Sequence, residues 1–198
     1  MAKRLEGKTA VVTGSTSGIG EAIARTFAAR GANVVVSGRR GERGEGVAAA
    51  IREHGGKAVF VEADLTDTGD CKNVCTRAKE EFGGLDILVN NAGIFPRSTL
   101  EETTPEFWDK VYAVNIRGAF FCCQAAVPLM RERNGGSIIN IGTVHPFVGA
   151  GRTLAYSTSK GALLTLTRNL AHILRKDHIR VNWVTVGWVL TEKEFEVQ

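Results

Sequence analysis

The sequence lacks the features that mark membrane, secreted or nucleic-acid-binding proteins. Its longest apolar runs are far shorter than the ~20 residues that a membrane-spanning helix needs. The first residues, MAKRLEGK, contain no apolar stretch of the kind found in signal peptides. The net charge of +4 is scattered, and no basic stripe with interleaved aromatic residues is present. We therefore expect a cytoplasmic protein without a membrane or nucleic-acid partner.

Cysteine is also scarce, and its spacing does not suggest a metal site. Cys71 and Cys75 are one helical turn apart, and Cys122 and Cys123 are adjacent. Neither pair forms half of a zinc-binding pattern. We expect free thiols in a reducing compartment and no bound metal. No linker or repeat divides the 198 residues, of which 43% are hydrophobic, so the sequence predicts a single domain over residues 1–198.

What the chain has in abundance is glycine, and one glycine-rich stretch dominates its N-terminal part. The apolar run 10–12 predicts a buried strand, and apolar residues recur at helical spacing from Ile23 to Ala28 before Gly31. A glycine-rich turn between a strand and a helix N-terminus can hold a phosphate group, because backbone N–H groups can approach the ligand closely. The residues of this predicted phosphate-binding turn are Gly14, Ser15, Thr16, Ser17, Gly18, Ile19 and Gly20.

Strand and helix patterns alternate along the whole chain. This alternation predicts an α/β, Rossmann-type doubly wound parallel sheet, with helices on both faces and the strand order 3-2-1-4-5-6. Ligands of such sheets bind beyond the carboxyl ends of the strands. The predicted strands cover residues 10–12, 33–37, 58–63, 85–89, 137–141 and 180–186, and the predicted helices 44–54, 67–82, 105–130 and 153–175, in addition to the helix that follows the glycine-rich turn and closes at Gly31.

The residues that follow the second strand bear on cofactor choice. An acidic side chain at this point would bind a ribose 2′-hydroxyl and repel a 2′-phosphate. The chain instead has Ser37, Gly38, Arg39 and Arg40, which favour NADP(H), while NAD(H) remains possible. The alternative is that both arginines simply form a solvated turn. Asp64, at the end of the third strand, could accept a hydrogen bond from an adenine amino group.

A tyrosine and a lysine provide candidates for proton transfer. Tyr156 and Lys160 are four residues apart in a predicted helix and therefore share one face. A neighbouring ammonium group would lower the pKa of the phenol, which could then exchange a proton with an alcohol or a carbonyl. Thr143, after the fifth strand, offers a hydroxyl group to the same oxygen. Such a pair alone is a weak signal, because most are surface or packing residues.

Together, these patterns resemble the short-chain dehydrogenase/reductase family of the classical type. TGSTSGIG, NNAG and YSTSK match its glycine-rich turn, its N-N-A-G motif and its Y-x-x-x-K motif, and an asparagine stands at the family's active-site position in the long helix. The resemblance implies hydride transfer between a nicotinamide cofactor and a carbonyl/alcohol pair. The matching positions are Thr13–Gly20, Asn90–Gly93, Tyr156–Lys160 and Asn115.

The resemblance also implies roles for single residues. Tyr156 would be the general acid/base, Lys160 would bind the nicotinamide ribose and lower the pKa of Tyr156, and Asn115 would support a proton relay. Further residues that would contact the cofactor are Asp64, Leu65, Asn91, Ala92, Gly93, Gly187, Val189 and Thr191. A protein of the same fold that binds a dinucleotide without turnover is the alternative to an enzyme.

The chain departs from the family pattern at three points. Thr143 stands where the family usually has serine, Val186 replaces the proline before Gly187, and the chain stops at Gln198. The family continues through a substrate lid and a seventh strand, so we expect the 198 residues to be a truncated form of a longer chain. The alternative is a natural short form that hides its edge strand in an oligomer.

Substrate identity and assembly are encoded weakly. His145, Phe95 and Trp188 could line a substrate pocket, although a loop histidine more often has only a structural role. The helices predicted at 105–130 and 153–175 carry apolar residues on more than one face. We expect one of these faces to meet a second copy, in a homodimer or a homotetramer. The expected partner is otherwise a small carbonyl or alcohol substrate.

Overall fold

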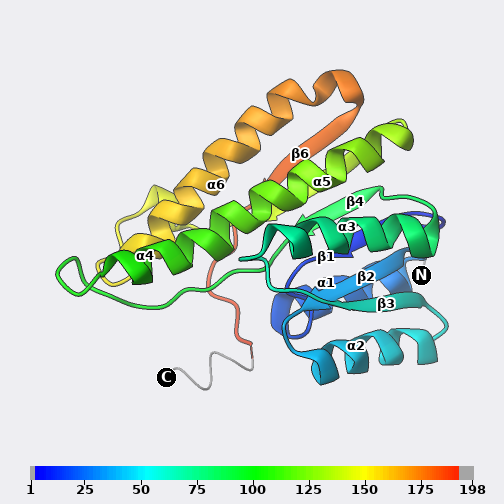
Figure 1. The fold of residues 1–198 in the computed structure, drawn as a ribbon, viewed down its shortest axis with the longest axis horizontal. Helices are drawn as coiled ribbons and strands as arrows, with labels where there is room; N and C mark the ends of the chain where they lie inside the picture. Colours follow the sequence, from blue (N-terminus) through cyan, green and yellow to red (C-terminus); the bar gives the residue numbers. More distant parts are fainter. Residues whose placement is uncertain (1–2, 192–198) are drawn as a thin grey trace.

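A computed structural model of the chain, which describes residues 3–191, contains one six-stranded sheet. The strand order is β3-β2-β1-β4-β5-β6, and every neighbouring pair is parallel (Figure 1). Both the fold class and the strand order predicted from the sequence are confirmed. The strands are β1 (Thr9–Val12), β2 (Asn33–Gly38), β3 (Lys57–Glu62), β4 (Ile87–Asn90), β5 (Gly136–Ile141) and β6 (Ile179–Val184).

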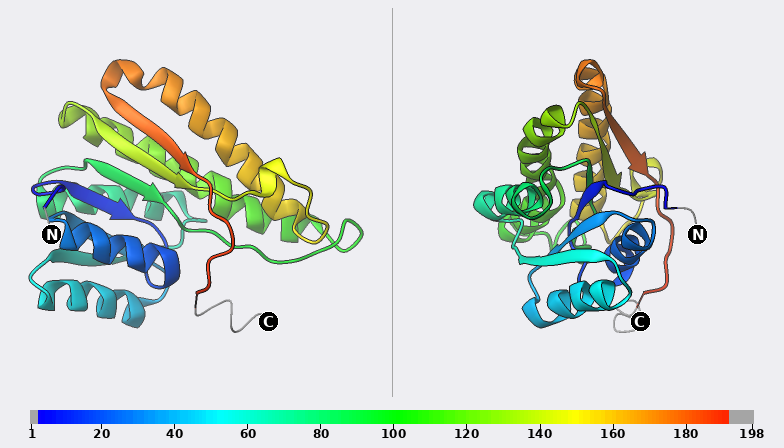
Figure 2. Two further views of the ribbon diagram at one scale, coloured as in Figure 1. Left: turned by 180° about the vertical axis from the view of Figure 1, so that it is seen from behind. Right: turned by 90° about the vertical axis from the view of Figure 1, so that its right-hand side faces the viewer.

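Helices cover the two faces of the sheet unequally (Figure 2). On one face, α1 (Gly18–Ala29) and α2 (Gly41–Glu53) lie over the half of the sheet that contains β1, β2 and β3. On the other face lie α3 (Thr68–Phe82), α5 (Ala119–Glu132) and α6 (Leu154–Ile173). Short helical turns, η2 (His145–Phe147) and η3 (Arg175–Asp177), flank α6.

Two hydrophobic cores result, one on each face. Adjacent residues of a strand point to opposite faces, so Val11 joins the core beneath α3 and α5 whereas Val12 joins the core beneath α1. Both valines are fully buried. This two-sided burial explains why the strands appear in the sequence as continuous apolar runs rather than as alternating patterns.

The predicted long helix is divided into three segments. Thr104 caps α4 (Pro105–Tyr112) by accepting a hydrogen bond from the N–H of Phe107 at 3.2 Å, and a π-helical segment, η1 (Ala113–Gly118), then leads into α5. Short π-helical segments occur often at functional sites, and η1 carries Asn115. The sequence pattern gives no sign of this change in helical hydrogen bonding.

By length and composition, one continuous helix among the described residues, Pro105–Glu132, could cross a membrane. It packs instead as a core helix of the sheet. Cys122, Cys123 and Met130 of its α5 segment are almost completely buried, and α5 lies beside α3 (Figure 1).

The described part of the chain ends beyond an edge strand. β6 pairs only with β5, and it stops at Val184, two residues before the predicted end. The segment that follows runs back across the carboxyl ends of the strands toward α1 (Figure 2). The predicted seventh strand and lid lie outside the described residues.

Candidate active site

The glycine-rich turn packs so closely against the NNAG segment that only glycine fits at two of its positions. Gly14 and Gly18 have φ angles of +62° and +57°, in the left-handed region. A Cβ atom at Gly14 would lie 2.8 Å from Cα of Ala92, and one at Gly20 would lie 2.4 Å from Nδ2 of Asn91. The turn after β1 and the NNAG segment after β4 therefore pack against one another without intervening side chains.

Hydrogen bonds hold these two segments together. Oγ1 of Thr13 accepts from the N–H groups of Asn91 at 3.0 Å and Ala92 at 3.1 Å. Nδ2 of Asn91 donates to the carbonyl oxygens of Thr13 at 2.9 Å and Gly14 at 3.1 Å. Asn91 thus stabilises the turn. Thr13, which was not among the predicted site residues, supplies the acceptor on the other side.

The residues present fit a dinucleotide phosphate. Ser17 is the N-cap of α1, but its side chain makes no capping hydrogen bond, so the first turn of the helix keeps free N–H donors. These donors and the positive end of the helix dipole favour an anion above Gly18. A Cβ at Gly14 or Gly20 would collide with Ala92 or Asn91, whereas one at Gly18 would meet only Thr191, at 3.5 Å.

The two arginines after β2 are arranged differently. The guanidinium of Arg40 donates from Nη2 to Oγ1 of Thr16 at 3.2 Å and to Oγ of Ser17 at 2.7 Å, which places its charge beside the turn. Arg39 is 64% exposed, and its Nη1 lies 4.0 Å from Oδ2 of Asp64. The loosely held Arg39 can turn toward a ligand, whereas Arg40 is already oriented by the turn.

Asp64 and Leu65 follow β3 at the same edge of the sheet. The Asp64 carboxylate accepts from the N–H of Thr66 at 3.0 Å, and this hydrogen bond is the main cause that lowers its pKa. The N–H of Asp64 donates to Oδ2 of Asp70 at 2.8 Å, which ties the segment to α3. Leu65 is buried against Gly118, where a Cβ would lie 2.8 Å from its carbonyl oxygen.

Tyr156, Lys160 and Thr143 meet at the carboxyl ends of β4 and β5. Lys160 is 4% exposed; its Nζ donates to the carbonyl oxygen of Ile141 at 2.8 Å and lies 5.9 Å from the centroid of the Tyr156 ring. Burial lowers the pKa of Lys160 to about 8. The Thr143 side chain is near enough to the Tyr156 hydroxyl to lower its pKa.

The pKa of Tyr156 departs from the expected direction. Burial raises it above the usual value, and the hydrogen bond with Thr143 lowers it in part. Lys160 is not among the causes of the shift, because its own pKa of about 8 leaves the amine neutral in the pH range where the phenol titrates. The expected lowering by Lys160 is therefore absent, and Thr143 is the group that favours the phenolate.

Asn115 connects the loop after β4 to α6. Its Oδ1 accepts from the N–H of Ile94 at 2.8 Å, while its Nδ2 donates to the Ile94 carbonyl at 2.8 Å and to Oγ of Ser159 at 3.1 Å. Ser159 in turn donates to the carbonyl of Tyr156 at 2.7 Å. The sequence analysis missed Ser159, since a buried serine in the YSTSK motif has no distinguishing pattern. A Cβ on Gly93 would lie 3.4 Å from Asn115 and 3.6 Å from Lys160, so glycine lets both amide and amine face one space.

The predicted substrate residues separate into two groups. The rings of His145 and Phe95 both lie edge-on to Tyr156, with centroid distances of 5.4 Å and 6.3 Å. Trp188, by contrast, is 72% exposed, and Gly187 beside it is also exposed. The structure thus brings the first two residues to the tyrosine but leaves Trp188 largely in solvent.

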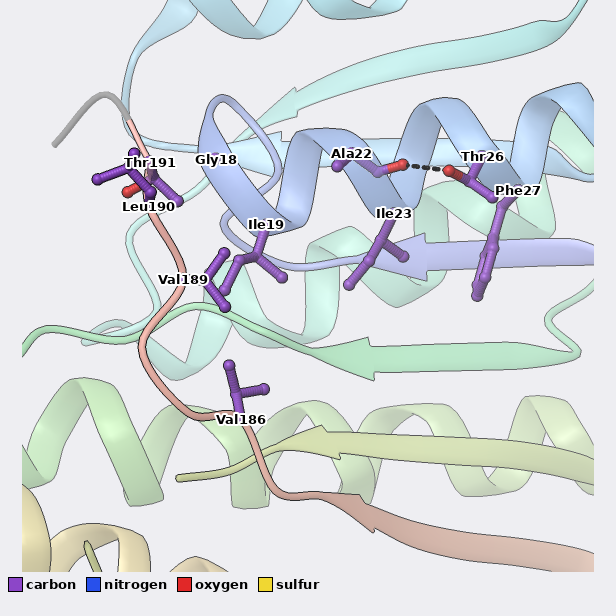
Figure 3. A pocket seen from close by; sticks show the side chains of 10 residues that line it. All are labelled: Gly18, Ile19, Ala22, Ile23, Thr26, Phe27, Val186, Val189, Leu190 and Thr191. Carbon is purple, nitrogen blue, oxygen red and sulfur yellow. Dashed lines mark hydrogen bonds between the residues drawn. The ribbon is translucent and has the colours of Figure 1, made fainter. Parts of the chain in front are cut away.

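The segment after β6 faces α1 across an apolar cavity of about 550 Å³. Figure 3 shows Ile23 and Phe27 of α1 on one side, and Val186 and Val189 on the other. Thr191 also lines this cavity, and its Cγ2 lies 3.5 Å from where a Cβ of Gly18 would stand. Val189 and Thr191 therefore lie near the start of α1; their contact with a cofactor stays a prediction.

Two cysteines support the segments of this site from behind: Sγ of Cys71 donates to the carbonyl oxygen of Leu65 at 3.5 Å, and Sγ of Cys123 accepts from Nδ2 of Asn90 at 3.2 Å. All four are free and buried between α3, α5 and the sheet. Within residues 3–191, no group of three or more histidine, cysteine or acidic side chains is arranged to hold a metal ion.

Comparison with known proteins gives the family. The family model described as short chain dehydrogenase matches residues 8–197. An NADP-dependent (R)-specific alcohol dehydrogenase of Lentilactobacillus kefiri is 40% identical, over 96% of this chain and 77% of the relative. A D-beta-hydroxybutyrate dehydrogenase of Cupriavidus necator is 37% identical, over 94% of this chain and 72% of the relative.

The fold comparison agrees. A solved structure from Sinorhizobium meliloti 1021, titled as a short-chain alcohol dehydrogenase, has a TM-score of 0.92 and 36% identity, and the match covers 100% of this chain and 81% of that one. The sequence motifs, the geometry around Tyr156 and these matches agree, and the chain belongs to the short-chain dehydrogenase family of oxidoreductases.

Proposed function

We propose that this protein transfers hydride between NADP(H) and a carbonyl/secondary-alcohol pair, with Tyr156 as the general acid/base. The observation that carries the proposal is the convergence of Tyr156, Thr143 and Lys160 on the sheet edge that also bears the glycine-rich turn. No packing requirement explains why a nearly fully buried lysine should face a tyrosine there, since burying an ammonium group is costly.

The proton chemistry follows from this geometry. In alcohol oxidation, Tyr156 accepts the hydroxyl proton of the substrate, and in carbonyl reduction it returns one to the oxygen. Thr143 donates to the same oxygen and keeps it aligned with the phenol. When bound, the nicotinamide ring supplies the hydride acceptor or donor. Because the pKa of Tyr156 is raised, oxidation, which needs the phenolate, should speed up toward alkaline pH.

The electrostatics of the turn support NADP(H). Arg39 and Arg40 place two permanent positive charges where an acidic side chain would disfavour a 2′-phosphate. In the proposed complex, Arg40 stays beside Thr16 and Ser17 while Arg39 leaves Asp64 for the phosphate. The name of the Lentilactobacillus kefiri relative, which includes NADP dependence, is consistent with this choice.

The direct test is turnover of purified protein. A panel of secondary alcohols, including D-3-hydroxybutyrate and a simple aliphatic 2-alcohol, is incubated with NADP⁺ or NAD⁺, and the absorbance of the reduced nicotinamide is followed. We expect turnover of at least one alcohol, faster with NADP⁺ at limiting cofactor. Tight cofactor binding without turnover on the whole panel and on the matching ketones would favour the non-catalytic alternative.

We further propose assembly through α5 and α6, in the cytoplasm. Phe120 and Ile173 on these helices are 43% and 54% exposed, more than their apolar character favours in a monomer. Light scattering should give a dimer or a tetramer, and Phe120→Glu should shift the mass toward the monomer. A wild-type monomer at micromolar concentration contradicts this arrangement.

A further inference from the structure

His145 is held by hydroxyl groups of the helix that carries Tyr156. Its Nδ1 lies 3.3 Å from Oγ1 of Thr153 and 3.3 Å from Oγ of Ser157, and these two oxygens are 3.1 Å apart. Thr153 is the N-cap of α6, but its side chain makes no capping hydrogen bond. The threonine hydroxyl is thus directed to the imidazole instead of to the helix, where an N-cap threonine usually acts.

His145 contacts Tyr156 through its ring and Thr143 through its main-chain N–H. Its ring is edge-on to the Tyr156 ring, with an interplanar angle of 87° and centroids 5.4 Å apart, a favourable aromatic geometry. Its main-chain N–H points to Oγ1 of Thr143 at 3.5 Å. A second edge-on ring, Phe95, meets Tyr156 from the loop after β4, at 6.3 Å and 67°.

We propose that His145 is a positioning residue: anchored by Thr153 and Ser157, it fixes the Tyr156 ring so that the phenol stays aligned with Thr143. This inference rests on the proposed role of Tyr156 as general acid/base. The alignment matters because small displacements of a reacting group slow a reaction strongly, by about 10²-fold for about 1 Å. His145 acts through Tyr156, since its Nδ1 is engaged by the two α6 hydroxyls.

The anchor and the ring can be separated by substitution. His145→Phe keeps an edge-on ring but loses the hydrogen bonds, Ser157→Ala removes one anchor, and His145→Ala removes both ring and anchor. We expect His145→Ala to lower kcat about tenfold to 10²-fold, while the dissociation constant of NADP(H) stays within about twofold. His145→Phe and Ser157→Ala should each cost less, and their combination should cost no more than His145→Phe alone, because both break the same link.

The ring position can be observed directly, because the chain has two tyrosines. In protein with ¹³C-labelled tyrosine rings, His145→Ala should shift the Tyr156 resonances and leave those of Tyr112, which stacks on Trp108 at 4.7 Å, unchanged. Tyr112→Phe assigns the signals, and circular dichroism confirms that each variant is folded. Unshifted Tyr156 signals, or a normal kcat in folded His145→Ala, would overturn the positioning role.

Tyr156→Phe separates this inference from the proposed function. If Tyr156→Phe is inactive and His145→Ala is fully active, His145 is not a positioning residue but Tyr156 remains the acid/base. If Tyr156→Phe is active, the proposed function itself is wrong. In a further outcome, the decrease of kcat at low pH disappears in both His145→Ala and His145→Phe, while the tyrosine signals stay unshifted. His145 is then itself an acid/base group, and the positioning role is wrong.

Discussion

The two halves of the sheet create their sites by different physical means. Around β1 and β2, the proposed binding surface is made of backbone. A Cβ on Gly20 would lie only 2.4 Å from Asn91, so the segments pack without side chains there, and the first N–H groups of α1 have no side-chain cap and could bind a phosphate. Around β4 and β5, side chains dominate, and Lys160 and Asn115 are each tied to a main-chain carbonyl. Binding in the first half should therefore depend on the absence of atoms, and chemistry in the second on single functional groups.

The largest expected effect in the backbone half comes from adding one methyl group. In Gly20→Ala, the new Cβ would meet Nδ2 of Asn91 at 2.4 Å and the carbonyl oxygen of Gly14 at 2.5 Å. The turn must shift, and affinity for NADP(H) should fall about 10²-fold, or about 3 kcal/mol. Gly46→Ala in α2, where nothing lies within 4 Å, is the control and should stabilise the protein slightly. If fluorescence titration gives both variants the same affinity for NADP(H), cofactor binding does not depend on the absence of a Cβ at Gly20.

In the side-chain half, Thr143 should depend on its hydroxyl rather than on its shape. Thr143→Ala should lower kcat about tenfold to 10²-fold, because the hydroxyl that donates to the substrate oxygen in the proposed complex is lost. Thr143→Ser keeps the hydroxyl and should retain or improve the rate. Steady-state kinetics of the two variants decide the point, and a harmless alanine would make Thr143 purely structural.

The arginines test whether any side chain matters in the backbone half. Arg39→Ala should weaken NADP(H) about tenfold or more and leave NAD(H) nearly unchanged, since charged hydrogen bonds contribute about 1.5–3 kcal/mol. Arg40→Ala, which loses the bonds to Thr16 and Ser17 of the shared turn, should weaken both cofactors. Arg43→Ala, an exposed position one turn into α2, is the matched control. If Arg39 and Arg40 behave like Arg43 in parallel cofactor titrations, the preference for NADP(H) has no basis in these residues.

The smallest expected effect is the pH dependence of stability that Lys160 adds. Its pKa is lowered to about 8 in the folded protein, so above that pH the unfolded chain binds the extra proton and stability rises with pH. Relative to Lys160→Met, the wild type should gain about 1 kcal/mol of unfolding free energy between about pH 7 and pH 9. Burial raises the pKa of Cys75 and Cys123, and the hydrogen bond with Cys71 raises that of Cys122; these shifts act in the opposite direction but are common to both proteins. A difference that is flat or falls with pH would contradict the buried ammonium.

The sequence predicted the backbone half well because its signals are local. The Gly14–Gly20 turn and the apolar runs of β1 and β2 are visible in single short windows, and the structure has them within one or two residues. Glycine at positive φ and an uncapped helix start are properties of the chain itself. The role of Arg40 was less visible, since only the fold shows that its guanidinium reaches back to Thr16 and Ser17.

The second half was predicted in its members but not in its connections. That Tyr156 and Lys160 share one helix face followed from their spacing, whereas the bond from Asn115 to Ser159 joins residues 44 apart in the sequence and no pattern signals the π-helical turn at Asn115. The sign of the Tyr156 pKa shift was also missed, because the extent of burial cannot be inferred from spacing. The link between His145, Thr153 and Ser157 likewise exists only when η2 folds against α6.

The most direct measurement compares cofactor binding and turnover in Tyr156→Phe. The substitution removes one oxygen from the side-chain half and leaves the glycine-rich turn intact. We predict that the dissociation constant of NADP(H) stays within about twofold while kcat falls by about 10²–10⁴-fold, as for a positioned proton donor. A variant that binds cofactor normally and still turns over alcohol at a near wild-type rate would contradict the assignment of Tyr156. It would also contradict the claim that single side chains around β4 and β5 carry the chemistry while the backbone around β1 and β2 binds the cofactor.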